Sequence, residues 1–138
     1  MQTFLPLPDF AASARTLDRQ RLGKQRVEAW MLFDLLTNPE SRWTSWRHHP
    51  VVRMWRGYED ALSVYFWAMV SEWKSRGYRS TIVLPHPVGH VMLPPWLGDE
   101  RLHGSHRSNL LRKAPEWYAR FGWTEAPDLP YFWPGRDG

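Results

Sequence analysis

The pattern with the clearest chemical potential is a charged stripe in the first third of the chain. Its members recur at steps of three and four residues, so on a helix they would share one narrow face. They are Leu17, Arg21, Lys24, Glu28, Met31 and Leu35. The stripe is apolar at both ends and charged in the middle, which indicates a helix whose charged residues line a cleft. A carboxylate in such a cleft is suited to proton transfer, because burial and adjacent cations change its pKa in opposite directions. The alternative, an ordinary surface ion pair between Lys24 and Glu28, is the better interpretation on periodicity alone.

Positive charge in this chain is supplied almost entirely by arginine. The 138 residues include 18 lysines and arginines against 14 aspartates and glutamates, and only Lys24, Lys74 and Lys113 are lysines. Five cations fall within three turns of the same helix, namely Arg15, Arg19, Arg21, Lys24 and Arg26. Positive charge there opposes the helix dipole, so the cluster has no evident folding benefit. Guanidinium groups match phosphate geometry, and together with 10 tryptophans they favour a nucleic-acid partner. The alternative is a coding bias toward arginine, with the tryptophans in the core.

A second polar segment, from Asp99 to Lys113, is expected to form a helix with few apolar anchors. Its basic residues are Arg101, His103, His106, Arg107, Arg112 and Lys113. This composition predicts either a second phosphate-contacting surface or a solvated outer helix.

Several classes of site are excluded by what the sequence lacks. It has no cysteine, which excludes disulfides and thiolate metal sites. Pro87 and Gly89 separate His86 from His90, and no carboxylate stands at a ligand spacing, so we expect no metal and no cofactor. Neither a glycine-rich phosphate loop nor a nucleophile-elbow motif is present. The apolar runs are too short for a membrane span, and residues 1–10 carry no secretory signal. We therefore expect a cytoplasmic protein, associated with the nucleoid if it is bacterial.

The elements that must position these residues are mainly helical. We expect one domain over residues 1–138, because the length suits a single core and no linker divides it. Helices are expected at about Thr16–Thr37, Pro50–Gly77, Asp99–Lys113 and Pro115–Gly122. Thr16 or Asp9 would cap the first of them. Four prolines make Arg79–Gly98 an extended crossing with a short strand at Thr81–Leu84, and Ala126–Gly138 is expected to be an extended aromatic strap.

Three blocks of this sequence together carry a resemblance to a known family. They are Gln20-Arg21-Leu22 followed by Glu28, then Lys74-Ser75-Arg76-Gly77-Tyr78, and finally Pro115-Glu116-Trp117-Tyr118-Ala119-Arg120-Phe121-Gly122. They resemble, in this order, a Gln-His-Leu motif with its downstream catalytic glutamate, a Lys-Arg-Gly-aromatic helix end and a Pro-x-Trp-Tyr-x-x-Phe-Gly block. All three belong to the pyrimidine-dimer DNA glycosylases with AP-lyase activity, of the phage endonuclease V type.

The resemblance implies a compact all-helical protein that kinks damaged duplex DNA and flips a nucleotide at the lesion. In that family the α-amine of the first residue attacks the sugar C1′ to form a Schiff base, the base leaves, and β-elimination cuts the strand. Here the amine would be that of Met1, because Gln2 is too large to permit methionine removal, and Glu28 would assist proton transfer. The side chain of Lys24 is the alternative amine.

The resemblance also implies which residues meet the DNA. They are Arg21, Lys24, Arg26, His106, Arg107, Trp117 and Tyr118. The first three would hold phosphates, and Trp117 and Tyr118 would contact the DNA near the damaged bases. Arg21 stands where the family has histidine, and Arg107 neighbours a position that is basic in the family.

Double-stranded, damaged DNA is therefore the expected partner of a monomeric protein. An α-amine loses its proton about two pH units below a lysine side chain, so a larger fraction is nucleophilic near neutral pH. The main alternative is a non-catalytic DNA-binding protein that retains the fold and the basic surface. The remaining alternatives are RNA binding and an unrelated small-molecule enzyme whose cleft uses Glu28.

Overall fold

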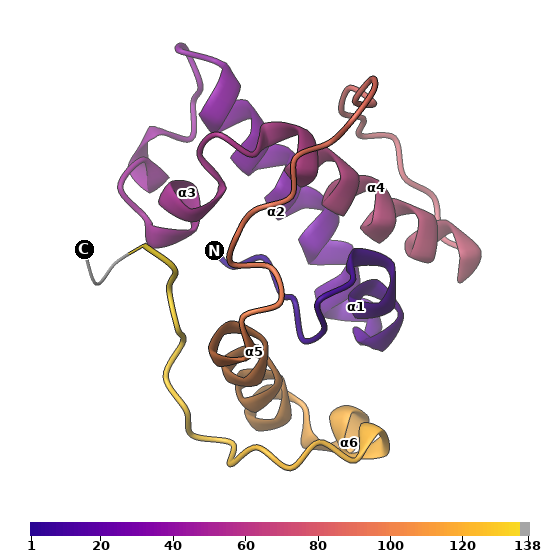
Figure 1. Cartoon of the computed structure of the whole chain (residues 1–138). Coiled ribbons are helices and arrows are strands. Elements are labelled where there is room, and N and C mark those ends of the chain that lie inside the picture. Colours follow the sequence, from indigo (N-terminus) through magenta and orange to yellow (C-terminus); the bar gives the residue numbers. More distant parts are fainter. Residues whose placement is uncertain (136–138) are drawn as a thin grey trace.

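The computed structural model describes residues 1–135, and the regular structure in that range is entirely helical (Figure 1). The α-helices are α1 (Phe10–Thr16), α2 (Arg19–Thr37), α3 (Pro50–Trp55), α4 (Glu59–Ser75), α5 (Glu100–Lys113) and α6 (Pro115–Tyr118). Two 3-10 helices, η1 (Thr44–Trp46) and η2 (Ala119–Phe121), complete the set. The prediction of a mainly helical fold is confirmed. No helix in the described range is both long enough and apolar enough to cross a bilayer.

The charged stripe is positioned by the packing of α2 along α4. Leu22 and Leu32 of α2 and Leu62 of α4 are fully buried, so they fix which face of α2 turns inward. Gly23 allows close approach, since a Cβ atom there would lie 2.8 Å from the ring of Trp73 on α4. These contacts on the neighbouring face of α2 fix the direction in which the charged stripe faces.

The helix expected over Thr16–Thr37 is divided into α1 and α2. Leu17, between them, has an extended backbone with φ −72° and ψ 139°, and its side chain is fully buried. Asp9 caps α1 by accepting a hydrogen bond from the backbone N–H of Ala12 at 2.7 Å. Asp9 therefore caps α1 only, whereas α2 begins at Arg19 with Asp18 at its N-cap and no side-chain cap hydrogen bond. Thr16 caps neither helix, because it ends α1.

The helix expected over Pro50–Gly77 is also divided, into α3 and α4. Gly57 lies between them with φ of 88°, a left-handed conformation that an α-helix cannot contain. His49 caps α3 by accepting a hydrogen bond from the N–H of Val51 at 3.0 Å. The break turns the chain so that α3 and α4 are separate elements of the core.

Residues 79–98 form the expected extended crossing, but the short strand predicted at Thr81–Leu84 is wrong. The backbone there pairs with side chains of α4 rather than with another strand. Trp67 donates to the carbonyl of Leu84 at 3.2 Å, and Trp73 donates to that of Arg79 at 2.8 Å. Near both ends of the predicted strand, therefore, indole groups of α4 rather than a second strand hydrogen-bond to the backbone.

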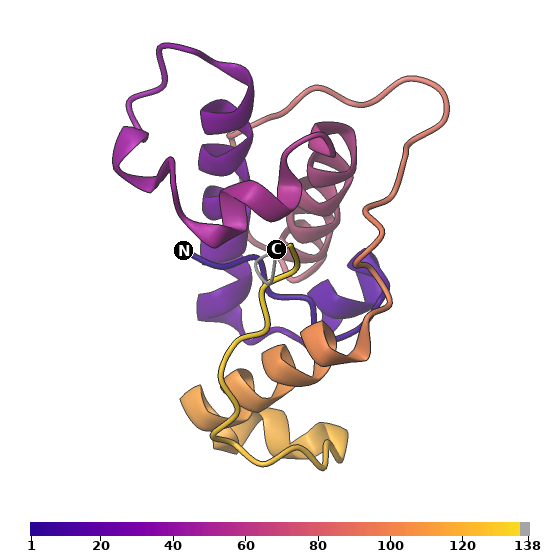
Figure 2. The ribbon, with the colours of Figure 1, turned by 60° about the vertical axis from the view of Figure 1, so that its left-hand side comes forward.

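Helix α5 is polar in sequence yet buried in the structure. It begins and ends as predicted, but every residue from Leu102 to Leu110 is buried. The prediction of a solvated outer helix is wrong, and a phosphate-contacting surface cannot include residues 102–110, whereas Arg112 and Lys113 at the end of α5 are exposed. The physical reason is that α5 packs against the amino-terminal segment and against the extended chain that follows η2 (Figure 2).

The polar side chains of α5 supply the hydrogen bonds that the strap requires. The Ser108 hydroxyl donates to the carbonyl of Ala126 at 2.5 Å and accepts from the N–H of Leu129 at 3.0 Å. Asn109 donates to the carbonyl of Leu129 at 3.1 Å. The expected strap is confirmed over residues 126–135, and residues 136–138 lie outside the described range.

Candidate active site

A cleft of about 290 Å³ opens between the amino terminus, α2 and the end of α5. It is lined by Met1, Gln2, Phe4, Gln20, Arg21, Lys24, Gln25, Glu28, Lys113 and Tyr131. The prediction that Arg21, Lys24 and Glu28 line a cleft is confirmed. Two helical steps, of three and four residues, thus bring two cations and one carboxylate to the same concave surface as Met1.

Glu28 is the most constrained of these charged groups. Its side chain is 13% exposed, and Oε2 accepts hydrogen bonds from the backbone N–H of Gln2 at 3.2 Å and from the amide of Gln25 at 3.1 Å. Its other oxygen, Oε1, lies 3.9 Å from Nζ of Lys24, whose side chain is 71% exposed. Glu28 is therefore fixed through Oε2. The predicted i,i+4 ion pair with Lys24 is present, but its carboxylate is largely buried rather than on the open surface.

Residues 3 and 4 of the amino-terminal segment are held by side chains of α2, α3 and α4. The N–H of Phe4 donates to Oε1 of Gln25 at 2.9 Å, and the hydroxyl of Tyr65 lies 2.9 Å from the carbonyl of Phe4. The indole of Trp55 donates to the hydroxyl of Thr3 at 3.0 Å. These contacts are buried, so they fix the path of the chain immediately after Met1.

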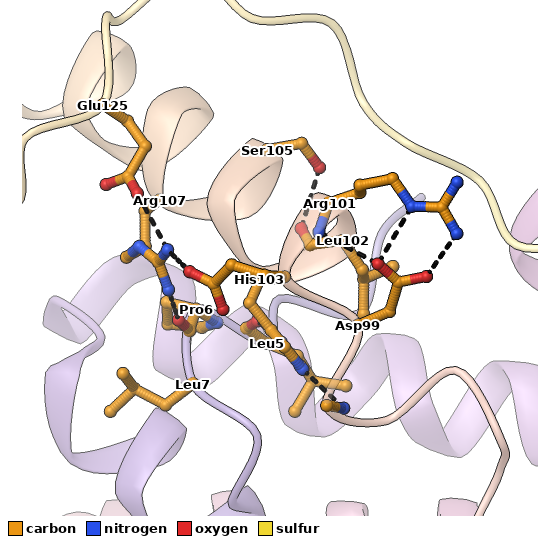
Figure 3. A network of polar contacts seen from close by, with 12 residues as sticks. Leu5, Pro6, Leu7, Asp99, Arg101, Leu102, His103, Ser105, Arg107 and Glu125 are labelled. Carbon is orange, nitrogen blue, oxygen red and sulfur yellow. Dashed lines mark hydrogen bonds and ion pairs between the residues drawn. The ribbon is translucent and has the colours of Figure 1, made fainter.

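The next residues are held by α5 (Figure 3). The N–H of Leu5 donates to Nδ1 of His106 at 2.9 Å, and the carbonyl of Leu5 accepts from Nδ1 of His103 at 2.7 Å. Arg107 donates to the carbonyl of Pro6 at 2.8 Å and forms ion pairs with Glu100 and Glu125. Side chains of α5 thus provide the backbone of residues 5 and 6 with its hydrogen-bond partners.

Both histidines of this contact are held in the neutral form by their surroundings. Burial, followed by the charge of His103, lowers the pKa of His106 to about 3. Burial also lowers the pKa of His103, against a smaller raising effect of the Leu5 carbonyl. Neutrality suits the geometry, because Nδ1 of His106 must keep a lone pair to accept from Leu5.

The predicted DNA contacts of His106 and Arg107 are therefore replaced by internal ones. His106 is fully buried and Arg107 is 9% exposed, with its guanidinium turned toward Pro6 and Glu125. Sequence composition identified both as basic residues on one helix but not the direction in which they face. The reason is that α5 packs against the amino terminus and buries this face.

Trp117 and Tyr118 join α6 to the start of α2. Tyr118 is fully buried; its hydroxyl donates to Oδ1 of Asp18 at 2.5 Å and accepts from the N–H of Asp18 at 3.1 Å. Trp117 is partly buried and donates to the carbonyl of Thr16 at 2.7 Å, while Arg120 stacks 3.7 Å above its ring. Tyr118 is turned inward, against the prediction of a DNA contact, whereas Trp117 is only partly buried.

Arg26 lies away from the cleft. Its guanidinium stacks 4.7 Å from the ring centre of Trp73 and donates to the hydroxyl of Ser80 at 2.6 Å. Burial lowers the pKa of Arg26. The expected cluster of cations therefore separates, and Arg21 and Lys24 alone of the three predicted α2 contacts reach the cleft.

Lys113, at the end of α5, is a third cation of the cleft, in addition to Arg21 and Lys24. Its pKa is lowered by burial first and then by the charges of Arg112, Arg21 and Lys24. Mutual effects of this kind require that the four cations lie close together. The cleft is consequently bordered by positive charge from two helices.

Several residues of the site were not predicted from the sequence. Gln25 could have been predicted from its spacing, since it stands three residues before Glu28 and so lies close to it on a helix. No sequence pattern indicates Tyr131, because its position depends on the path of the strap. His49 lies near the amino terminus, whose positive charge, after burial, lowers the pKa of that histidine. Among residues 1–135, no three or more His, Asp or Glu side chains are grouped so as to hold a metal ion.

Comparison with known proteins adds one finding to this geometry. The family model for pyrimidine dimer DNA glycosylase matches residues 1–86, which is more than half of the chain and includes Met1 and Glu28. No curated protein and no solved structure matches the chain significantly.

Proposed function

The chain belongs to the pyrimidine dimer DNA glycosylase family, a family of DNA-repair glycosylases, and we propose that it acts through an imine formed by the amine of Met1. Glu28 is the acid–base group of this reaction, and strand cleavage by β-elimination follows base release. The substrate is damaged duplex DNA that carries a pyrimidine dimer.

The observation that carries this proposal is the contact between the start of the chain and Glu28. The backbone nitrogen of Gln2 lies 3.2 Å from Oε2 of Glu28. The amine of Met1 is the backbone nitrogen that immediately precedes it, one residue away. Met1 also lines the cleft. A nucleophile and a proton acceptor within one cleft are the two groups that imine formation requires.

In the proposed reaction the Met1 nitrogen bonds to C1′ as the bond from C1′ to the base breaks. The base leaves with the electron pair and takes a proton from water. Glu28 accepts the proton lost by nitrogen and returns it to O4′ when the C1′–O4′ bond opens to give the protonated imine. The carboxylate then removes a proton from C2′ as the C3′–O bond breaks and the phosphate leaves. Water finally hydrolyses the imine and restores the amine.

The border of the cleft supports a role in holding DNA. Arg21, Lys24 and Lys113 place positive charge around the opening, and cations of this kind bind the phosphate backbone. A displaced nucleotide needs a pocket with a flat apolar wall, which Tyr131 and Phe4 supply. The partly exposed Trp117 is the proposed contact beside the lesion.

Trapping with borohydride tests the proposal directly. Wild-type protein incubated with abasic-site or dimer-containing duplex should form a covalent adduct, and peptide mass mapping should place it on Met1. A Lys24→Arg variant keeps the charge without a nucleophilic amine and should trap normally, whereas an added amino-terminal residue should abolish trapping. Glu28→Gln should lose strand cleavage with DNA affinity unchanged or higher.

The outcomes separate the alternatives. Binding without an adduct would identify a DNA-binding protein that lacks the amine chemistry. An adduct on Lys24 would refute the assignment to Met1. A Glu28→Gln variant that loses affinity and melting temperature together would show that Glu28 has a structural role only.

A further inference from the structure

We propose that Gln25 is a positioning residue that sets the Glu28 carboxylate relative to the amino-terminal amine, an inference that rests on the proposed function. Gln25 is 2% exposed and contacts both partners with one side chain. Its Oε1 accepts from the N–H of Phe4 at 2.9 Å, and its Nε2 donates to Oε2 of Glu28 at 3.1 Å. One planar amide therefore links the chain that follows Met1 to the carboxylate.

The orientation of this amide is fixed by its neighbours. If the amide were rotated by half a turn, Nε2 would meet the N–H of Phe4, and Oε1 would meet the oxygen of Glu28. The first contact would join two donors and the second two acceptors, so only the observed orientation satisfies both. Gln25 can therefore present only a donor to Glu28.

Tyr65 reinforces the same arrangement from α4. Its hydroxyl lies 2.7 Å from Oε1 of Gln25 and 2.9 Å from the carbonyl of Phe4, with one proton to donate to either. Burial, and then the negative charge of Glu28, raise the pKa of Tyr65 well above its usual value. Tyr65 thus remains a neutral hydrogen-bond donor at neutral pH and below. Removal of the hydroxyl would leave Gln25 Oε1 with the Phe4 contact alone.

This arrangement predicts an effect on chemistry that differs from an effect on binding. Gln25 lies in the wall of the cleft but is 2% exposed and uncharged, and Tyr65 is fully buried behind it, so neither side chain is expected to hold a phosphate. Loss of a hydrogen bond to a charged group should slow adduct formation by about 10- to 100-fold at saturating DNA. The DNA dissociation constant should stay within about twofold of the wild-type value.

The test compares Gln25→Glu and Gln25→Met by the rate of borohydride-trappable adduct on abasic duplex, from about pH 5 to about pH 8. Near neutral pH the new carboxylate has no proton to give Glu28, so Gln25→Glu should be slow. At the acid end the two carboxyls share a proton, which restores a donor, so its rate relative to wild type should rise. Gln25→Met has no such proton and should be slow throughout. A merely structural role for Gln25 would produce no recovery that is specific to the glutamate variant.

Tyr65→Phe provides a second, milder variant should the Gln25 variants fail to fold. It keeps the ring and removes one donor to Gln25, so adduct formation should fall by roughly 2- to 10-fold with DNA affinity retained. Tyr58→Phe is the matched control, because Tyr58 lies at the junction of α3 and α4 outside the cleft, and its rate should equal that of wild type.

The results distinguish this inference from its premise. A wild-type protein that traps no adduct would refute the proposed function, and the inference with it. Normal trapping by wild type together with wild-type rates in both Gln25→Met and Tyr65→Phe would refute the inference alone. An equal loss of rate and DNA affinity in these variants would also refute it.

Discussion

Acid should release the amino-terminal segment from α5 through His106. The pKa of His106 is about 3 in the folded protein, because the ring is fully buried and lies near His103. In the unfolded chain a histidine titrates near 6.5. The unfolded state therefore binds more protons below this value, so stability is complete above about pH 6.5 and falls as the pH is lowered toward 3.

The size of the effect follows from this difference. Each pH unit between the two pKa values costs about 1.4 kcal/mol, so His106 alone should remove about 2 kcal/mol between pH 7 and pH 5. His103, whose pKa is also lowered, acts in the same direction. The loss is a substantial part of the roughly 5–15 kcal/mol that stabilises a typical domain.

Urea unfolding at pH 7, 6 and 5 measures this loss. The matched variant is His106→Asn, whose amide oxygen can accept from the N–H of Leu5 but does not titrate. It should be less stable than wild type at pH 7, because a smaller side chain leaves a cavity beside Phe4 and Tyr131. Its decrease in stability from pH 7 to pH 5 should be smaller by about 2 kcal/mol. Identical decreases in the two proteins would refute the assignment of acid sensitivity to His106.

Three further changes have definite expected outcomes. Lys113→Gln should weaken DNA binding and reduce by about one the slope of log affinity against log salt, measured by fluorescence anisotropy; an unchanged slope would exclude a phosphate contact. Arg107→Met leaves Glu125 without its buried cation and should lower the free energy of unfolding by about 3 kcal/mol in urea, and a change below about 1 kcal/mol would contradict this. Tyr118→Phe removes the hydrogen bonds to Asp18 and should cost about 1–2 kcal/mol by thermal melting, with Trp117 fluorescence as a check that α6 stays docked.

The part of the site that lies on α2 could be predicted from the sequence because its geometry is local. Helical periodicity alone places Arg21, Lys24 and Glu28 on one stripe, and the structure has them line one cleft. Arg26 shows the limit of that argument. Its position on the helix was correct, but the aromatic ring of Trp73 and the hydroxyl of Ser80 determine where the guanidinium lies.

The remainder of the site could not be predicted, because its contacts join opposite ends of the chain. The partners of Leu5 are 98 and 101 residues away, and no periodicity encodes such a pairing. His106 and Arg107 were correctly identified as polar residues of one helix. Composition could not show that their partners would be backbone carbonyls and N–H groups instead of phosphates. The division between α3 and α4 could not be predicted either, since Gly57 tolerates a helical as well as a left-handed backbone. The division at Leu17 depends on the burial of that side chain in the core.

The proposed nucleophile lies at the end of the chain, and this position creates a physical problem that these long-range contacts address. Chain ends fray unless other parts of the fold hold them, and a frayed amine would rarely stand beside its proton acceptor. Here donors and acceptors from α2, α4 and α5 engage the backbone of residues 2, 4, 5 and 6 in turn. The amide of Gln25 then joins the same segment to Glu28. It follows that substitutions of His103, His106 or Arg107, which contact the segment from outside the cleft, should slow the proposed chemistry by displacing the amine while leaving the cations of the cleft in place.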